Sequence, residues 1–229
     1  MASSLAKSSS SVLLLAAFVA LFAASASVDA ATFNVINRCK DTLWPAALPG
    51  GGARLDPGKT WTVQVPAGTA HARMWARTGC RFDGSGRGTC QTGDCGGALA
   101  CTVSGRTPAT LAEYTLNNNG PDYIDISLVD GFNVPMSFRC GGKGPSCKAD
   151  VNAKCPAKLK VPGGCASACE KLGGDTYCCR GQYTDKCPPT DYSRFFKGLC
   201  LDAYSYAKDD QTSTFTCPKG SNYEIVLCP

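Results

Sequence analysis

Four acidic residues lie close together in the middle of the sequence: Glu113, Asp122, Asp125 and Asp130 fall within eighteen residues. Paired carboxylates can act as acid and base on glycosidic bonds, and clustered carboxylates accept hydrogen bonds from sugar hydroxyl groups. Acidic residues are equally common on the solvated edges of strands. The spacing alone leaves both interpretations open, a solvated surface or a groove for sugars.

Other catalytic patterns find little support. His71 is the only histidine and no G-x-S-x-G sequence occurs, so serine-type nucleophilic catalysis is not indicated. The Gly-Lys-Thr at 58–60 follows Pro57 and lacks the glycine that a phosphate loop needs five positions earlier. We therefore expect no cofactor.

The chain contains 16 cysteines, and their spacing argues against metal or redox chemistry. There is no C-x-x-C, and the short gaps are the three residues between Cys165 and Cys169 and the four between Cys90 and Cys95, with one histidine in the chain, which is not the usual pattern of a zinc site. An even number at this density is typical of a disulfide framework in an oxidising compartment. Cys178 and Cys179 should have different partners, because neighbouring Cα atoms are about 3.8 Å apart, closer than a disulfide usually allows.

Residues 1–30 have the layout of a secretory signal peptide: Lys7, an apolar run at 12–23, and small residues before a cut after Ala30. The mature chain, residues 31–229, is therefore expected in the extracellular space. Its formal net charge remains +5, because the removed segment carries one lysine and one aspartate. This mild basicity is not the dense basic stripe of a nucleic-acid-binding protein.

Alternating apolar residues predict strands at 32–36, 61–65, 123–129 and 223–227. Many short strands separated by glycine and proline favour an antiparallel sandwich. Residues 78–108 hold four cysteines without apolar periodicity and indicate a loop lobe. Residues 147–200 hold eight cysteines and indicate a second lobe. This lobe contains the best helix signal, in which Tyr192, Phe195, Phe196 and Leu199 follow a cap at Thr190 or Asp191.

The sequence "GRGTCQTGDCGGALAC" (86–101) matches the signature of a known family. Further blocks follow in the same order, among them "WARTGC", "TLAEYTL", "DYIDISLVDGFNVPM", "YSRFFKGLC" and "SNYEIVLCP". Over the whole mature chain the sequence resembles the thaumatin-like proteins, the fifth group of plant pathogenesis-related proteins.

The resemblance implies a mainly β fold, a flattened antiparallel sandwich formed by residues 31–77, 109–146 and 201–229. A disulfide-rich lobe with short helices (147–200) and a small stapled loop lobe (78–108) complete it. It also implies eight disulfides: Cys39 with Cys228, Cys80 with Cys90, Cys95 with Cys101, Cys140 with Cys217, Cys147 with Cys200, Cys155 with Cys165, Cys169 with Cys178, and Cys179 with Cys187. In this framework Asp94 is expected to shape a turn by accepting hydrogen bonds from nearby backbone amides.

The resemblance implies a ligand-binding cleft between the sandwich and the helical lobe. Its residues carry over to Arg73, Glu113, Asp125, Asp130 and Asp209, and Asp122 is not among them. The implied role is that of a secreted antifungal protein, a monomer that binds β-1,3-glucan of fungal walls without metal or nucleic acid. Action on fungal membranes is a further role of the family for which no motif here provides evidence.

Two rival hypotheses remain. One is a weak endo-β-1,3-glucanase with Glu113 as acid and Asp125 or Asp209 as base or nucleophile. The other is an inhibitor of digestive hydrolases that presents Arg81 or Arg87 on the loop closed by Cys80 and Cys90, although Gly86 and Gly88 are expected to loosen that loop.

Overall fold

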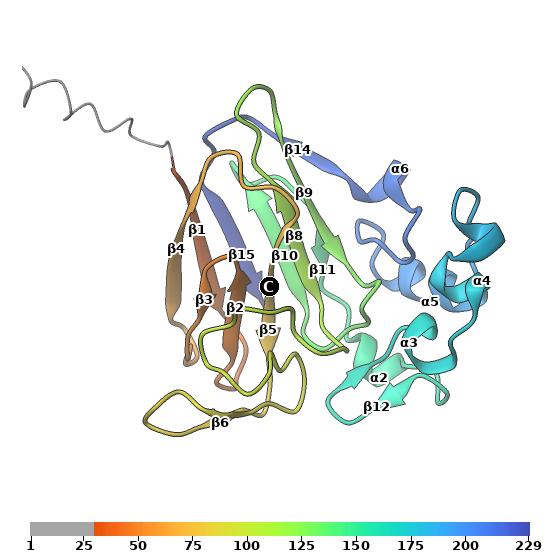
Figure 1. The fold of residues 1–229 in the computed structure, drawn as a ribbon, viewed down its shortest axis with the longest axis horizontal. Coiled ribbons are helices and arrows are strands. Elements are labelled where there is room, and N and C mark those ends of the chain that lie inside the picture. The colour runs from red at the N-terminus through yellow and green to blue at the C-terminus, as the bar shows by residue number, and fades with distance from the viewer. Residues whose placement is uncertain (1–29) are drawn as a thin grey trace, which may run out of the picture.

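The computed structural model describes residues 30–229, so the predicted signal peptide lies outside the described residues except for Ala30. Two sheets form a sandwich, with the short helices on one side of it and a small hairpin beyond one end (Figure 1). Within residues 30–229 no helix is long and apolar enough to cross a membrane.

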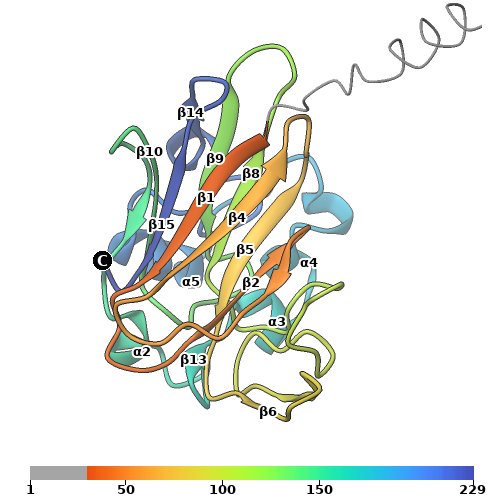
Figure 2. The ribbon, with the colours of Figure 1, turned by 90° about the vertical axis from the view of Figure 1, so that its left-hand side faces the viewer.

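The first sheet has five strands in the order β11-β10-β15-β1-β4 (Figure 2). Their bounds are β1 (Ala30–Asn37), β4 (Thr60–Pro66), β10 (Met136–Cys140), β11 (Ser146–Cys147) and β15 (Tyr223–Leu227). Among the described strands of the two sheets, β1 and β15 form the one parallel pair, and the other pairings are antiparallel. The predicted sandwich is thus confirmed, with one parallel pairing that the sequence did not indicate.

The second sheet has six strands in the order β14-β9-β8-β5-β2-β3. Their bounds are β2 (Trp44–Leu48), β3 (Gly51–Gly52), β5 (Ala72–Arg77), β8 (Leu111–Thr115), β9 (Asp122–Ser127) and β14 (Phe215–Cys217). The pattern of apolar residues predicted β9 but not β5 or β8. Five of the six side chains of β5 are buried, so it lacks the alternation that marks a half-buried strand.

Aromatic rings join the two sheets in the core. Phe33 of β1 stacks on Tyr223 of β15 with ring centroids 4.4 Å apart, and it also contacts Tyr114 of β8 at 4.5 Å. The alternation in β1 explains this, because Phe33 and Val35 point inward while their neighbours are half-buried. Each buried side chain of this size contributes about 1.5–3 kcal/mol of hydrophobic stabilisation.

The helical lobe contains the predicted helix as α5 (Asp191–Leu199). Thr190 caps it, and Ser193 completes a capping box by bonding back to the Thr190 backbone. Shorter elements make up the rest of the lobe: α2 (Val151–Lys154), β12 (Lys160–Val161), β13 (Gly164–Cys165), α3 (Ala168–Leu172), α4 (Asp175–Cys178) and the 3₁₀ turn η1 (Gly181–Tyr183). Such short helices are marginal alone, so tertiary contacts and disulfides must hold them.

The loop lobe contains a small hairpin, β6 (Arg81–Phe82) and β7 (Gly88–Thr89). The Asp83 carboxylate organises its turn by accepting hydrogen bonds from the Ser85 and Arg87 backbone amides and from the Ser85 hydroxyl. The expectation of a loosened loop is therefore wrong, because the turn is held both by Asp83 and by the disulfide at its base.

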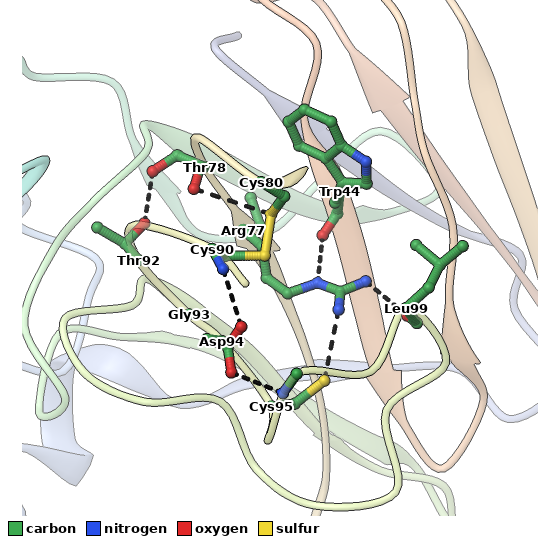
Figure 3. The surroundings of a disulfide bond; sticks show 12 residues. Trp44, Arg77, Thr78, Cys80, Cys90, Thr92, Gly93, Asp94, Cys95 and Leu99 are labelled. Atoms are coloured by element: carbon green, nitrogen blue, oxygen red, sulfur yellow. Dashed lines mark hydrogen bonds between the residues drawn. A yellow bond between two sulfur atoms is a disulfide. The ribbon is translucent and has the colours of Figure 1, made fainter. Parts of the chain in front are cut away.

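Arg77, at the end of β5, secures the loop lobe from inside (Figure 3). Its side chain is fully buried, and its guanidinium donates to the carbonyl oxygens of Trp44, Ala98 and Leu99 at 2.7–2.9 Å. Burial lowers the pKa of Arg77 to about 10, and the nearby charge of Asp94 opposes this shift. The Asp94 carboxylate itself accepts from the backbone amides of Cys90 and Gly97, as expected of a turn-forming residue.

Eight disulfides connect the described residues, and they join the same pairs that the resemblance implied. Cys178 and Cys179 have different partners, as their adjacency required. Five of the bridges close loops of 6 to 10 residues in the two lobes, whereas Cys39–Cys228 spans 189 residues.

Candidate functional site

Three of the predicted site residues form a row across neighbouring strands of the six-stranded sheet. Arg73 of β5 lies opposite Glu113 of β8, and Glu113 lies opposite Asp125 of β9. Residues directly opposite in an antiparallel pair share a face, with Cβ atoms about 4.5–5.5 Å apart. The strand register therefore brings together side chains that are far apart in the sequence.

The opposite face of these strands explains why the row faces outward. Met74, Ala112 and Ile124, the neighbours of the row residues along the chain, are buried in the core. Because successive side chains in a strand point to opposite faces, Arg73, Glu113 and Asp125 must point away from the core. Each of the three is half-buried. The Arg73 guanidinium pairs with the Glu113 carboxylate at 3.1 Å.

The row forms the floor of a hollow of about 260 Å³, which we call the acidic groove. Asp130, in the turn after β9, adds a further carboxylate to its lining, and Tyr204 and Ala207 approach from the segment that follows the helical lobe. On the other side of the row a second hollow of about 220 Å³ is lined by His71 and Tyr123. The row thus lies between two open hollows, which suits a ligand that extends in both directions.

Burial raises the pKa of the three carboxyl groups that line the groove, so they are weaker acids than usual. It raises the pKa of Asp125 to about 8, with a further contribution from the negative charge of Glu113 and opposition from Arg73. Burial also raises the pKa of Glu113 and of Asp130, and in both cases the charge of Arg73 opposes the shift. Below its pKa Asp125 is an uncharged acid that can donate a hydrogen bond, and the carboxyl oxygens of the neighbouring Glu113 can accept one.

One oxygen of this acid has no protein partner. Asp125 Oδ1 is buried, and no other described residue forms a hydrogen bond with it. Such unsatisfied groups are rare in folded proteins and are often found where a ligand or water binds. Among residues 30–229, no group of three or more His, Cys, Asp or Glu side chains is arranged to hold a metal ion.

Asp209 is not brought to the row. Its Oδ2 accepts hydrogen bonds from the Ser205 backbone amide and hydroxyl and lies 3.1 Å from the Lys197 ammonium, and its side chain is only 11% exposed. Its Oδ1 accepts from the Thr212 hydroxyl. Asp209 therefore fastens α5 to the segment that carries Tyr204, and it is absent from the lining of the acidic groove.

Asp210, at the start of α6 (Asp210–Ser213), acts on the row through Tyr204 and through its charge. Its Oδ1 accepts a hydrogen bond from the Tyr204 hydroxyl at 2.8 Å, and its charge contributes to the raised pKa of Asp125. Asp122, which the family motif leaves out, is buried and accepts from the Tyr223 hydroxyl on the core side of the sheet.

Sequence comparison agrees with this architecture. The model of the thaumatin family matches residues 37–229. The chain belongs to the thaumatin family. A pathogenesis-related thaumatin-like protein 3.2 of Cryptomeria japonica is 58% identical, with 91% of this chain and 92% of the relative aligned. An α-amylase/trypsin inhibitor of Zea mays is 56% identical, over 87% of this chain and the whole of the inhibitor.

A solved structure of the thaumatin-like xylanase inhibitor TLXI has the same fold. It is 27% identical with a TM-score of 0.52, over 86% of this chain and 99% of that protein. The thaumatin family thus contains pathogenesis-related proteins and at least two proteins named as hydrolase inhibitors.

Two residues that act on the groove were missed at the level of sequence. Tyr204 lines the groove, and Asp210 binds the Tyr204 hydroxyl and acts on Asp125 through its charge. Both lie in "AYSYAKDD", where the family motif directs attention to Asp209 instead. The sequence shows two adjacent acids, but not that Asp209 pairs with Lys197.

Proposed function

We propose that this thaumatin-family protein is a secreted antifungal defence protein that binds β-1,3-glucan of fungal walls in the acidic groove. The observation that supports it best is the row formed by Arg73, Glu113 and Asp125 across three neighbouring strands. The eight disulfides fit an extracellular protein, and the family relatives are pathogenesis-related proteins.

The chemistry of the groove suits an uncharged, hydroxyl-rich chain. Glu113 and Asp130 offer carboxyl oxygens, Asp125 offers an acidic proton below its pKa of about 8, and Arg73 offers a fork of donors. Every ring hydroxyl can donate and accept, so such a chain can satisfy both kinds of group. An anionic polysaccharide would be repelled by the carboxylates at the floor of the groove.

The test is a double variant, Glu113→Gln with Asp125→Asn, measured for retention on insoluble β-1,3-glucan. Glu113→Gln replaces an anionic acceptor by a weaker neutral one, and Asp125→Asn replaces the carboxyl hydroxyl by an amide of different geometry, so binding should weaken by about tenfold or more. Asp191→Asn is a matched control, because its side chain is fully exposed on α5 and far from the row in sequence. Unchanged retention of the double variant would contradict the proposal.

Weak glycosidase activity is a second use of the same carboxyl groups. Glu113 and Asp125 lie opposite each other in the register, so two carboxyl groups stand on the same face of the sheet, as glycosidase chemistry requires. The pKa of about 8 favours Asp125 as the acid, and the ion pair with Arg73 favours Glu113 as the nucleophile, the reverse of the roles expected from sequence. A reducing-sugar assay on soluble β-1,3-glucan tests this, and no new reducing ends at any mildly acidic pH would exclude it.

Inhibition of a trypsin-like protease is supported by a different part of the molecule. Arg81 and Arg87 are exposed on a hairpin that Asp83 and a disulfide hold in shape, and a relative 56% identical to this chain is named an α-amylase/trypsin inhibitor. A rigid loop loses little entropy on binding. An inhibition assay with trypsin should show a loss of potency in Arg81→Ala or Arg87→Ala, and no inhibition by the unmodified protein would rule this function out.

A further inference from the structure

The helical lobe contains a pocket that none of the functions above uses. Its volume is about 270 Å³, close to the lower end of the range for small-ligand sites. Its walls come from α3, α4, the start of α5 and the segment around Tyr206. We call it the lobe pocket.

The lobe pocket adjoins the acidic groove. Val129, Asp130 and Ala207 line both hollows, so these residues form the border between them. A chain that lies along the row of Arg73, Glu113 and Asp125 and continues past Asp130 would reach the lobe pocket next.

The side chains of the lobe pocket suit a sugar ring better than a purely apolar or strongly charged ligand. Three tyrosines line it, of which Tyr177 and Tyr192 contact each other edge to face with ring centroids 5.9 Å apart. Glu170 and Arg180 add one charge of each sign. Aromatic walls with a few polar groups are typical of small-molecule sites, and tyrosine provides both a flat apolar face and a hydroxyl group.

The lobe pocket is also held in shape before any ligand binds. Cys169–Cys178 connects α3 to α4, and Cys179–Cys187 connects α4 to the segment that leads into α5. All of these elements contribute to the walls. A preformed site avoids the entropic cost of ordering its walls on binding.

We propose that the lobe pocket is a subsite for the neighbouring sugar units of the same glucan chain that occupies the acidic groove. The inference rests on the proposed function, and it predicts that the affinity for a glucan depends on the number of its sugar units. Short oligosaccharides fill only the groove, whereas longer ones also contact the tyrosines of the lobe pocket.

The experiment is a calorimetric titration with β-1,3-linked oligosaccharides from the disaccharide to the heptasaccharide. Affinity should rise by about tenfold or more once the chain is long enough to reach the lobe pocket. Tyr206→Ala should remove most of that gain and leave the affinity for short oligosaccharides unchanged, because Tyr206 lines the lobe pocket and not the acidic groove.

Two further variants make the result unambiguous. Thr176→Trp, at an exposed position on α4, should fill the lobe pocket and abolish the same gain without removing any tyrosine. Tyr183→Ala is the control, since Tyr183 belongs to the same lobe but lines neither hollow. Binding that does not depend on chain length, or a length dependence that survives both Tyr206→Ala and Thr176→Trp, would overturn the subsite. If the unmodified protein binds no β-1,3-glucan at all, the proposed function fails and the subsite fails with it.

Discussion

At the scale of single residues, burial decides what each acid of the groove does. Burial raises the pKa of Asp125, which favours its neutral form. Asp209, although in the family motif, forms an ion pair with Lys197 and accepts hydrogen bonds from Ser205. A motif identifies residue types and positions, but the protonation and orientation of a carboxyl group depend on neighbours that a motif does not contain. Two predictions follow from these environments.

The first prediction concerns Asp125 and pH. An ordinary aspartate has a pKa of 3.8, and in the folded protein that of Asp125 is about 8. Between these values the folded chain keeps a proton that the unfolded chain has lost, so stability falls as pH rises through this window. Asp125→Asn removes that penalty and should melt about 5 °C above the unmodified protein near the upper end of the window. The difference should vanish at the acidic end.

Thermal melts followed by circular dichroism across this pH range measure the effect. Asp191→Asn is again the control, because its exposed side chain should give no such trend. A gap between Asp125→Asn and the unmodified protein that is independent of pH would show that Asp125 is not protonated in the folded state.

The second prediction separates the two adjacent aspartates. Asp209→Asn leaves the partly buried Lys197 without its counter-ion. This should lower the free energy of unfolding by about 1–3 kcal/mol and the melting temperature by several degrees. Asp210→Asn should leave stability nearly unchanged but lower the apparent pKa of Asp125, because one negative charge beside it is lost. Melting curves of both variants, with a titration of Asp125 by NMR, test this. Equal effects of the two variants would contradict the assignment.

At the scale of elements, the sequence predicted strands and a helix whose apolar pattern is clear. The alternation of β1, β4, β9 and β15 and the cap of α5 were readable. By contrast, β5 is buried at five of its six positions and β8 is only five residues long, so neither was predicted from its pattern. Glu113 was found as one of four clustered acids, whereas Arg73 was found only through the family resemblance. The parallel pairing of β1 with β15 depends on contacts between the two ends of the chain, which local patterns do not report.

The third prediction concerns the β6–β7 hairpin. A Cβ atom added at Gly88 would lie 1.8 Å from the Arg81 carbonyl oxygen, which is part of the backbone and cannot move aside cheaply. Gly88→Ala should therefore open the hairpin and expose residues 78–108 to proteolysis. Gly84→Ala is the matched control in the same hairpin, because nothing lies within 4 Å of its added Cβ. Limited proteolysis with mass spectrometry compares the two.

At the scale of the whole molecule, a sandwich core supports two lobes that are too thin to fold alone. The lobes are cross-linked by short bridges, whereas Cys39–Cys228 constrains the entire chain over 189 residues. Loop-closure entropy makes this long bridge worth about 5 kcal/mol in the chain-entropy model. The net charge of +5 does not describe the acidic groove, because three acidic side chains and one arginine line it while the chain as a whole is basic.

The fourth prediction follows from that long bridge. Replacing both Cys39 and Cys228 by serine should lower the free energy of unfolding by several kcal/mol, more than replacing Cys179 with Cys187, whose loop spans 8 residues. Denaturant unfolding followed by tryptophan fluorescence measures both variants. If the short bridge proved the more important, the stabilisation would come from local packing rather than from the constraint on the unfolded chain.

The position of β15 has a consequence for the order in which the protein can be made. In the five-stranded sheet β15 lies between β10 and β1, although it follows both of them in the sequence. Because synthesis runs from the N-terminus, β1 and β10 are made before the strand that joins them, and this sheet stays in two parts until residues 223–227 follow. A chain cut before β15 would leave β1 and β10 unjoined, so the sandwich cannot close around the aromatic core while synthesis is still short of that strand.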